Sequence, residues 1–126
     1  MSVIVEEIKI HSDMRGVVFE PVAEDSLCNQ QNVHIVMSQP DAVRGNHYHI
    51  SGTETIAVMG PALVRIKEKG KITDINVPAR KAYRFIIPPM ISHAIKNTGN
   101  QSNILAAFNT LAHDPTNPDV AEDILI

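Results

Sequence analysis

The chain has 126 residues, 44% of them hydrophobic and 20% charged, which suits about one soluble globular domain. A formal net charge of −3 gives no general attraction to nucleic acid, and no apolar run approaches the ~18 residues of a membrane span. The single cysteine, Cys28, excludes an internal disulfide and is expected to be buried, and the absence of a signal-peptide pattern predicts a cytoplasmic location.

Short runs rich in Val, Ile and aromatic residues follow one another along the chain, separated by Gly, Pro and Asn turn signals. In chain order we expect strands over residues 3–10, 17–22, 33–38, 55–59, 62–67, 72–77, 83–87, 93–96 and 104–109. Regular spacing of short strands is typical of an all-β sandwich or barrel, and no long amphipathic helix is evident. We therefore predict one all-β domain over residues 1–126. Residues 114–126 read as a polar turn and a short apolar tail, which packs on the barrel or on a partner.

The triplet His47-Tyr48-His49 is the strongest chemical signal in the sequence. Alternate residues of a strand point to the same face, so His47 and His49 offer two neighbouring imidazoles. A break at Ser51-Gly52 lets Glu54 return from the next strand, and the fold must bring in His93. Three imidazoles and one carboxylate suit zinc, iron, nickel or manganese better than calcium or magnesium. The sequence therefore predicts a transition-metal site, with a polar cluster that holds no metal as the alternative.

Two arginines are candidates for binding phosphate or sugar oxygens, because a guanidinium matches phosphate geometry. They are Arg15 and Arg44, and a plain surface position is the alternative for each. Strict alternation along a strand places Arg44 on the face opposite His47. Arg44 therefore needs a β-bulge at Gly45 to point inward.

Tyrosines and the remaining histidines carry weaker signals. Tyr48 and Tyr83 are candidate proton donors, although the sequence favours a buried structural tyrosine at each position. Tyr83 is retained as a candidate catalytic residue. Three histidines have no partner by spacing and are expected to be surface or satisfied core residues, namely His11, His34 and His113.

Two segments in order resemble the two motifs of the cupin superfamily. Residues 45–54, followed by Gly60, are similar to the first motif in a slightly shortened form, and residues 88–97 are similar to the second. The resemblance implies a double-stranded β-helix, or jelly-roll barrel. Met90 stands where the family usually has a glycine in a tight turn. Because a Cβ disfavours positive φ, we expect this loop to have a different shape, which affects the position of His93.

The resemblance extends to cupins that act on nucleotide sugars. Residues 44–49 and 114–119 are similar to the cupin domain of bifunctional capsular-polysaccharide enzymes, which epimerise and then reduce a UDP-linked 4-keto-deoxy sugar. Asp13-Met14-Arg15-Gly16 is similar to an element of dTDP-4-dehydrorhamnose 3,5-epimerases and dTDP-4-keto-6-deoxyhexose ketoisomerases. This likeness implies zinc, a nucleotide-sugar substrate and a role in cell-surface polysaccharide synthesis. The sequence has no Gly-x-Gly-x-x-Gly stretch, so no dinucleotide cofactor is implied.

The role of His47 differs between these relatives. In the rhamnose-type epimerases its counterpart is a free general base, whereas here His49, Glu54 and His93 complete a ligand set. A histidine that ligates a metal through one nitrogen cannot use that lone pair to take a proton. If the metal site forms, we therefore expect His47 to be a ligand. The competing functions are a metal-dependent small-molecule cupin enzyme, such as a dioxygenase or isomerase, and a non-catalytic sugar-binding cupin.

The resemblance also carries an expectation about assembly. A small β-barrel leaves apolar sheet edges unless they are closed or paired. Cupins of this size commonly exchange N-terminal strands, which predicts a homodimer involving Val3 to Ile10.

Overall fold

The computed structural model describes residues 2–126 as an almost entirely β structure with antiparallel strand pairing. Its elements are β1 (Ile4–Ile8), β2 (His11–Asp13), β3 (Gly16–Val18), η1 (Glu24–Asn29), β4 (Asn32–Ser38), β5 (Val43–His49), β6 (Glu54–Met59), β7 (Ala62–Glu68), β8 (Lys71–Val77), β9 (Ala82–Ile87), β10 (Ser92–Asn97), β11 (Asn103–Asn109) and β12 (Val120–Glu122). The predicted all-β class is confirmed.

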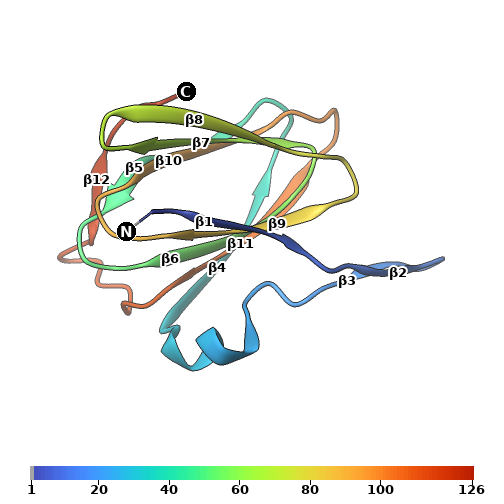
Figure 1. Ribbon diagram of the computed structural model, residues 1–126, viewed down its shortest axis with the longest axis horizontal. Coiled ribbons are helices and arrows are strands. Elements are labelled where there is room, and N and C mark those ends of the chain that lie inside the picture. The colour runs from blue at the N-terminus through green and yellow to red at the C-terminus, as the bar shows by residue number, and fades with distance from the viewer. Residues whose placement is uncertain (1) are drawn as a thin grey trace.

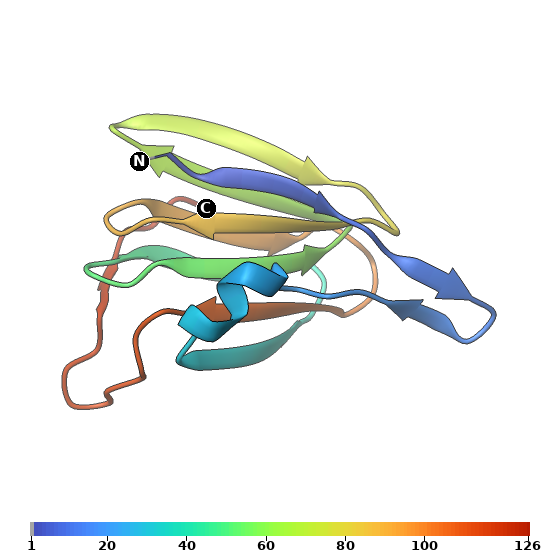
Figure 2. The same cartoon turned by 60° about the horizontal axis from the view of Figure 1, so that its bottom comes forward.

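Two five-stranded sheets form the body of the molecule (Figure 1). One has the order β1-β9-β6-β11-β4 and the other the order β12-β5-β10-β7-β8. Strands that follow one another in the sequence therefore often belong to opposite sheets, as in a jelly roll. A separate hairpin, β2–β3, extends away from the two sheets (Figure 2).

The core lies between the sheets and follows the alternation of the strands. Ile56 and Val58 of β6 and Phe85 of β9 come from one sheet, and Val64 and Ile66 of β7 come from the other. Phe85 and Val64 have no exposed surface. This apolar packing fills one end of the space between the sheets and leaves the end near β5 and the start of β6 for polar side chains.

Two local predictions were wrong. The strand expected over residues 17–22 ends at Val18, and the short 3-10 helix η1 follows it. Cys28 lies on η1 and is exposed rather than buried, because this helix buries none of its residues. No helix within residues 2–126 has the length and apolar character needed to cross a bilayer.

The C-terminal tail packs on the barrel. β12 pairs with β5, with Val120 opposite His49 and Glu122 opposite His47. Beyond β12, the Asn46 side chain accepts hydrogen bonds from the backbone amides of Leu125 and Ile126. Of the two positions expected for the tail, the structure shows the one on the barrel.

Candidate metal centre and cavity

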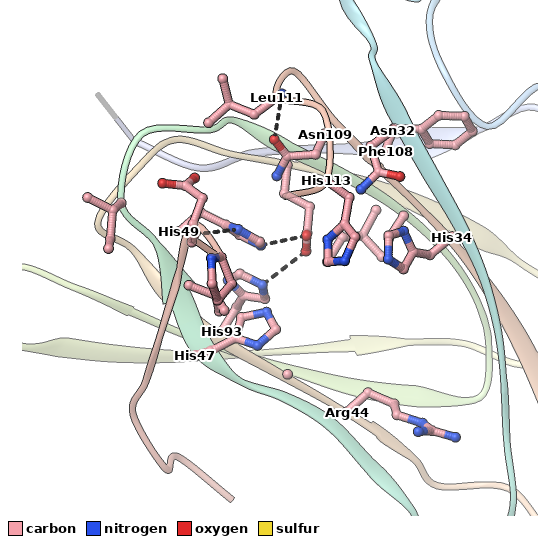
Figure 3. A pocket seen from close by; sticks show the side chains of 18 of the residues that line it. Asn32, His34, Arg44, His47, His49, His93, Phe108, Asn109, Leu111 and His113 are labelled. Atoms are coloured by element: carbon pink, nitrogen blue, oxygen red, sulfur yellow. Dashed lines mark hydrogen bonds and ion pairs between the residues drawn. The ribbon is translucent and has the colours of Figure 1, made fainter. Parts of the chain in front are cut away.

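Four side chains from three strands meet at one end of the space between the sheets. His47 and His49 come from β5, Glu54 begins β6, and His93 lies on β10. Their potential ligand atoms all lie within 4.8 Å of one another. Glu54 connects the group, because its two oxygens lie 2.7 Å from His49 Nε2 and 3.1 Å from His93 Nε2 (Figure 3). The structure thus brings together the four residues that the sequence singled out.

A β-bulge shapes β5 directly before the first histidine. His93 of β10 lies opposite His47, but the next residue, Ala94, lies opposite Gly45, which leaves Asn46 as the extra residue. Gly45 has φ +88°, and a Cβ at this position would approach the carbonyl oxygen of His93 to 2.7 Å. A glycine is therefore required for β5 and β10 to come this close. The bulge also gives Arg44 a place on the wall of the cavity beside the histidines.

Backbone carbonyl groups orient the rings of His49 and His93 through their Nδ1 atoms. His49 Nδ1 lies 3.1 Å from the carbonyl oxygen of Asp119, and His93 Nδ1 lies 3.1 Å from that of Ile91. A carbonyl only accepts hydrogen bonds, so each Nδ1 carries a proton. A carboxylate also only accepts hydrogen bonds, so in the absence of a metal Nε2 of each ring contacts Glu54 as a donor. A bound metal would replace that proton and take the Nε2 lone pair. This arrangement is typical of metal-ligating histidines, whose second nitrogen donates to a carbonyl or a carboxylate.

Asp119 also holds the turn between β5 and β6, the strands that carry His49 and Glu54. Its carboxylate accepts hydrogen bonds from the backbone amides of Ser51 and Gly52, at 2.9 Å and 2.8 Å. This turn lets Glu54 fold back to meet His49. Through these contacts, Asp119 orients the His49 ring and positions the Glu54 carboxylate.

Burial and charge set the protonation of this group. Burial, together with the nearby His93 and His49, lowers the pKa of His47 to about 4, against the opposing charge of Glu54. Burial alone would lower the pKa of His49, but its hydrogen bond with Glu54 and the charges of Glu54 and Asp119 raise it. Burial would raise the pKa of Glu54, yet hydrogen bonds and charges of His49 and His93 hold it well below its usual value. Glu54 is therefore an anion that faces three imidazoles.

The donor set fits a divalent transition metal. Bonds of ~2.0–2.2 Å to nitrogen and carboxylate oxygen place two donors on opposite sides of an ion about 4 Å apart. The largest separation among the four ligand atoms is within 4.8 Å, so small side-chain movements suffice. His47 offers a mostly neutral ring near neutral pH, which is the form that ligates.

A cavity of about 840 Å³ opens over these four residues. Its wall includes apolar side chains from β4, β6 and β11, such as Val36, Ile56 and Leu105. Arg44 lines it as well, and donates from Nε to Ser38 Oγ at 3.2 Å and from a terminal nitrogen to the Met37 carbonyl at 3.0 Å. The volume lies within the range of ~300–1,000 Å³ that is usual for small-molecule sites.

Residues 11–121 match the sequence profile of the polysaccharide biosynthesis C-terminal domain. The chain belongs to this family. A UDP-2-acetamido-2,6-beta-L-arabino-hexul-4-ose reductase of Pseudomonas aeruginosa is 26% identical over 117 residues, which cover 90% of this chain and 30% of the reductase.

Three solved structures share the fold of this chain. The capsular polysaccharide assembling protein CapF of Staphylococcus aureus is 23% identical, with a TM-score of 0.69, over 94% of this chain and 33% of CapF. ChmJ of Streptomyces bikiniensis, a 3'-monoepimerase solved with dTDP-quinovose, is 17% identical, with a TM-score of 0.76, over 95% of this chain and 68% of ChmJ. QdtA of Thermoanaerobacterium thermosaccharolyticum, a sugar 3,4-ketoisomerase solved with TDP, is 16% identical, with a TM-score of 0.72, over 94% of this chain and 86% of QdtA.

These likenesses show the cupin-like fold that the two sequence motifs predicted. The chain spans about a third of the length of the reductase and of CapF.

The second motif keeps its tight turn despite the change from glycine. Met90 adopts φ +68°, so the expectation of a differently shaped loop was wrong. Its backbone amide donates a hydrogen bond of 2.7 Å to the carbonyl oxygen of His49. This contact ties the turn to β5 and offsets the steric cost of the left-handed conformation. The turn thus leaves His93 beside His47 and His49 in this member of the family.

Other predicted site residues lie away from the candidate metal centre. Arg15 lies in the β2–β3 hairpin, where it forms an exposed ion pair with Asp13, and it does not line the cavity. Tyr83 lies on β9 opposite Val58, packed against the apolar core with its ring near that of Phe85, and is not part of the cavity wall. Tyr48 points from β5 to the other face of the sheet from its neighbouring histidines.

Two histidines that the sequence left without a role do line the cavity. His34 lies on β4 and His113 in the segment between β11 and β12, and their ring centroids are 6.2 Å apart. Both are exposed at the mouth. Alternation along residues 32–36 could have indicated that His34 shares a face with Asn32 and Val36, but nothing in the local sequence places His113 beside it.

Proposed function

We propose that this chain binds a divalent transition metal, most simply zinc, through His47, His49, Glu54 and His93. One observation carries the proposal, namely that three imidazoles and a carboxylate converge within 4.8 Å at the base of a cavity. Tetrahedral nitrogen and oxygen ligation is common for zinc. A metal at this place supplies Lewis-acid stabilisation for negative charge that develops on a carbonyl oxygen.

We further propose that the cavity serves an epimerase or isomerase acting on a nucleotide-linked 4-keto-6-deoxy sugar in cell-surface polysaccharide synthesis. Membership of a polysaccharide biosynthesis family supports the setting. The fold shared with a 3'-monoepimerase and a sugar 3,4-ketoisomerase supports the class of reaction. The chemistry uses the acidity of a carbon next to a ketone, since loss of its proton gives an enolate that can be reprotonated.

The chain's own residues define how such a substrate is held. Apolar side chains of β4, β6 and β11 cover part of the wall and keep water from that side of the sugar. Arg44 lies in the same wall with its guanidinium on the Ser38 hydroxyl and the Met37 carbonyl, neither of which neutralises its charge. It is therefore available to a diphosphate. Arg15 lies outside the cavity of its own chain, so its proposed contact with the substrate requires approach from another subunit or movement of the hairpin.

Metal content provides the first test. Purified protein grown with added zinc should contain about one metal ion per chain, and His49→Ala should contain much less because one ligand is lost. The matched control is His11→Ala, since His11 is an exposed histidine outside the cavity. Equal metal in the wild type and in His49→Ala would contradict the ligand set.

Proton exchange provides the test of the reaction. UDP- and dTDP-linked 4-keto-6-deoxy sugars are incubated with the protein in deuterated water, and NMR follows the loss of the C3 proton signal. We expect exchange with at least one of them. Arg44→Ala should bind that sugar roughly ten- to a hundred-fold more weakly, because a charge-assisted contact is worth ~1.5–3 kcal/mol. Oxygen consumption with a small-molecule substrate would indicate a dioxygenase instead. Sugar binding without proton exchange would indicate a non-catalytic binding role.

A further inference from the structure

The metal centre leaves the proposed reaction without an evident base. If His47, His49 and His93 ligate through ring nitrogens, their lone pairs are committed and cannot take a proton from a substrate. Glu54 is likewise committed and is held as an anion by the same rings. Proton transfer at a carbon next to a ketone must then come from other groups on the cavity wall.

Few other titratable side chains line this cavity. Arg44 offers a guanidinium, which has hydrogen-bond donors and no acceptor. Asp119 accepts from the amides of Ser51 and Gly52, and Asp114 accepts from the amide and hydroxyl of Thr116. The lining residues include no tyrosine, lysine or cysteine. What remains is the pair His34 and His113, and histidine is the side chain best suited to exchange protons near neutral pH.

The two rings are placed by different means. His34 points into the cavity because β4 alternates, with Asn32 and Val36 on the same inner face and Val33, Ile35 and Met37 exposed on the outer one. The segment that carries His113 is fixed at its start by Asn109, which accepts a hydrogen bond from the Leu111 amide at 2.8 Å.

The result is a pair of imidazoles with edge-to-face geometry, their planes at 81°. Figure 3 shows the two rings side by side in the cavity that also holds the metal ligands. No hydrogen bond or ion pair found among residues 2–126 involves a nitrogen of either ring. Both imidazoles therefore have nitrogens available to a substrate that enters the cavity.

We propose that His34 and His113 are the proton-transfer residues of this cavity, an inference that rests on the proposed function. One neutral imidazole takes the proton from the carbon next to the ketone. The electrons of the broken C–H bond form a C=C bond, and the carbonyl π electrons move to oxygen to give an enolate. The other ring, as an imidazolium, then donates its proton to the carbon and the ketone re-forms. The pair ends with the number of protons with which it started, and no further reactant is consumed.

The test compares His34→Ala and His113→Ala with the wild type in deuterium exchange at C3 of the nucleotide-linked 4-keto-6-deoxy sugars. Because a positioned acid or base contributes about 10²–10⁴-fold, each variant should exchange roughly a hundred-fold or more slowly. Metal content and affinity for free dTDP or UDP should stay as in the wild type. Free imidazole should restore part of the exchange, since both positions are exposed, and should not accelerate the wild type or the His11→Ala control.

The outcomes separate the two proposals. If the wild type exchanges and both variants match it, the proton-transfer assignment is wrong and the proposed function stands. If exchange falls only in proportion to nucleotide affinity and imidazole gives no rescue, the pair binds substrate and does not transfer protons. If the metal-loaded wild type exchanges none of the sugars, both the function and the role of the pair are overturned.

Discussion

Replacing Gly45 by alanine tests the close approach of β5 to β10 on which the candidate metal centre depends. Gly45 has φ +88°, and its added Cβ would lie 2.7 Å from the carbonyl oxygen of His93 and 3.3 Å from the Ala94 Cα. Both contacts are with the backbone of β10, which cannot move aside like the end of a side chain. Gly70 in the β7–β8 turn is the matched control, because it has φ +76° and no atom within 4 Å of an added Cβ.

The expected magnitudes follow from this geometry. A left-handed conformation costs an alanine ~1–2 kcal/mol, and this term applies to both variants. The collision with β10 adds ~1–3 kcal/mol at Gly45 alone, as for overpacking in a core. Alanine also restricts the unfolded chain, but equally in both variants, so that effect cancels in the comparison. For a chain of this size ~1 kcal/mol changes Tm by about 4 °C, so Gly70→Ala should lose roughly 4–8 °C and Gly45→Ala roughly 8–20 °C.

The assay is thermal unfolding of metal-free protein, followed by circular dichroism in the presence of a chelator. A zinc titration of the folded variants then measures their affinity for the metal. Gly45→Ala should bind zinc more weakly, because β10 must move away from the added Cβ and carries His93 with it. Equal losses of Tm in the two variants would refute the argument, since they would show that the approach of β5 to β10 at Gly45 carries no steric cost.

Three further outcomes are expected. Asp119→Ala should reduce the unfolding free energy by about 1–3 kcal/mol, because its charge-assisted hydrogen bonds to two backbone amides are lost. Asp114→Ala should reduce it less, because the Asp114 carboxylate forms hydrogen bonds only within its own loop. Similar losses for the two variants in urea unfolding would contradict this prediction. The pKa of His47, about 4 when folded, lies below its unfolded value, so the unfolded chain binds more protons between pH 4 and 6.5 and stability of metal-free protein falls as pH falls through that window. His47→Asn should flatten this pH dependence of Tm, and an unchanged slope would argue against it. The chain should also form a homodimer that involves residues 3–10, and a monomeric mass by light scattering at micromolar concentration would count against it.

Much of the candidate site could be predicted because its signals are local. The two histidines of β5 share a face through the two-residue period of a strand, and the Ser51-Gly52 break returns Glu54 to them. The fold class followed from short apolar runs with turn residues between them. These features depend on backbone geometry and on residues that lie close together in the sequence.

Only the tertiary structure decided which side chains share the cavity. Arg44 reaches the wall through the bulge that has Asn46 as its extra residue, and Tyr83 lies instead in the core packing. His113 comes from an irregular segment and meets His34 of β4 across a long separation in sequence. A loop has no period that fixes the direction of its side chains, and the pairing of distant strands depends on packing energies summed over the whole core. The sequence by itself therefore determined the candidate metal ligands and the β architecture, whereas the other groups that line the cavity were decided by how the two sheets and their loops close over it.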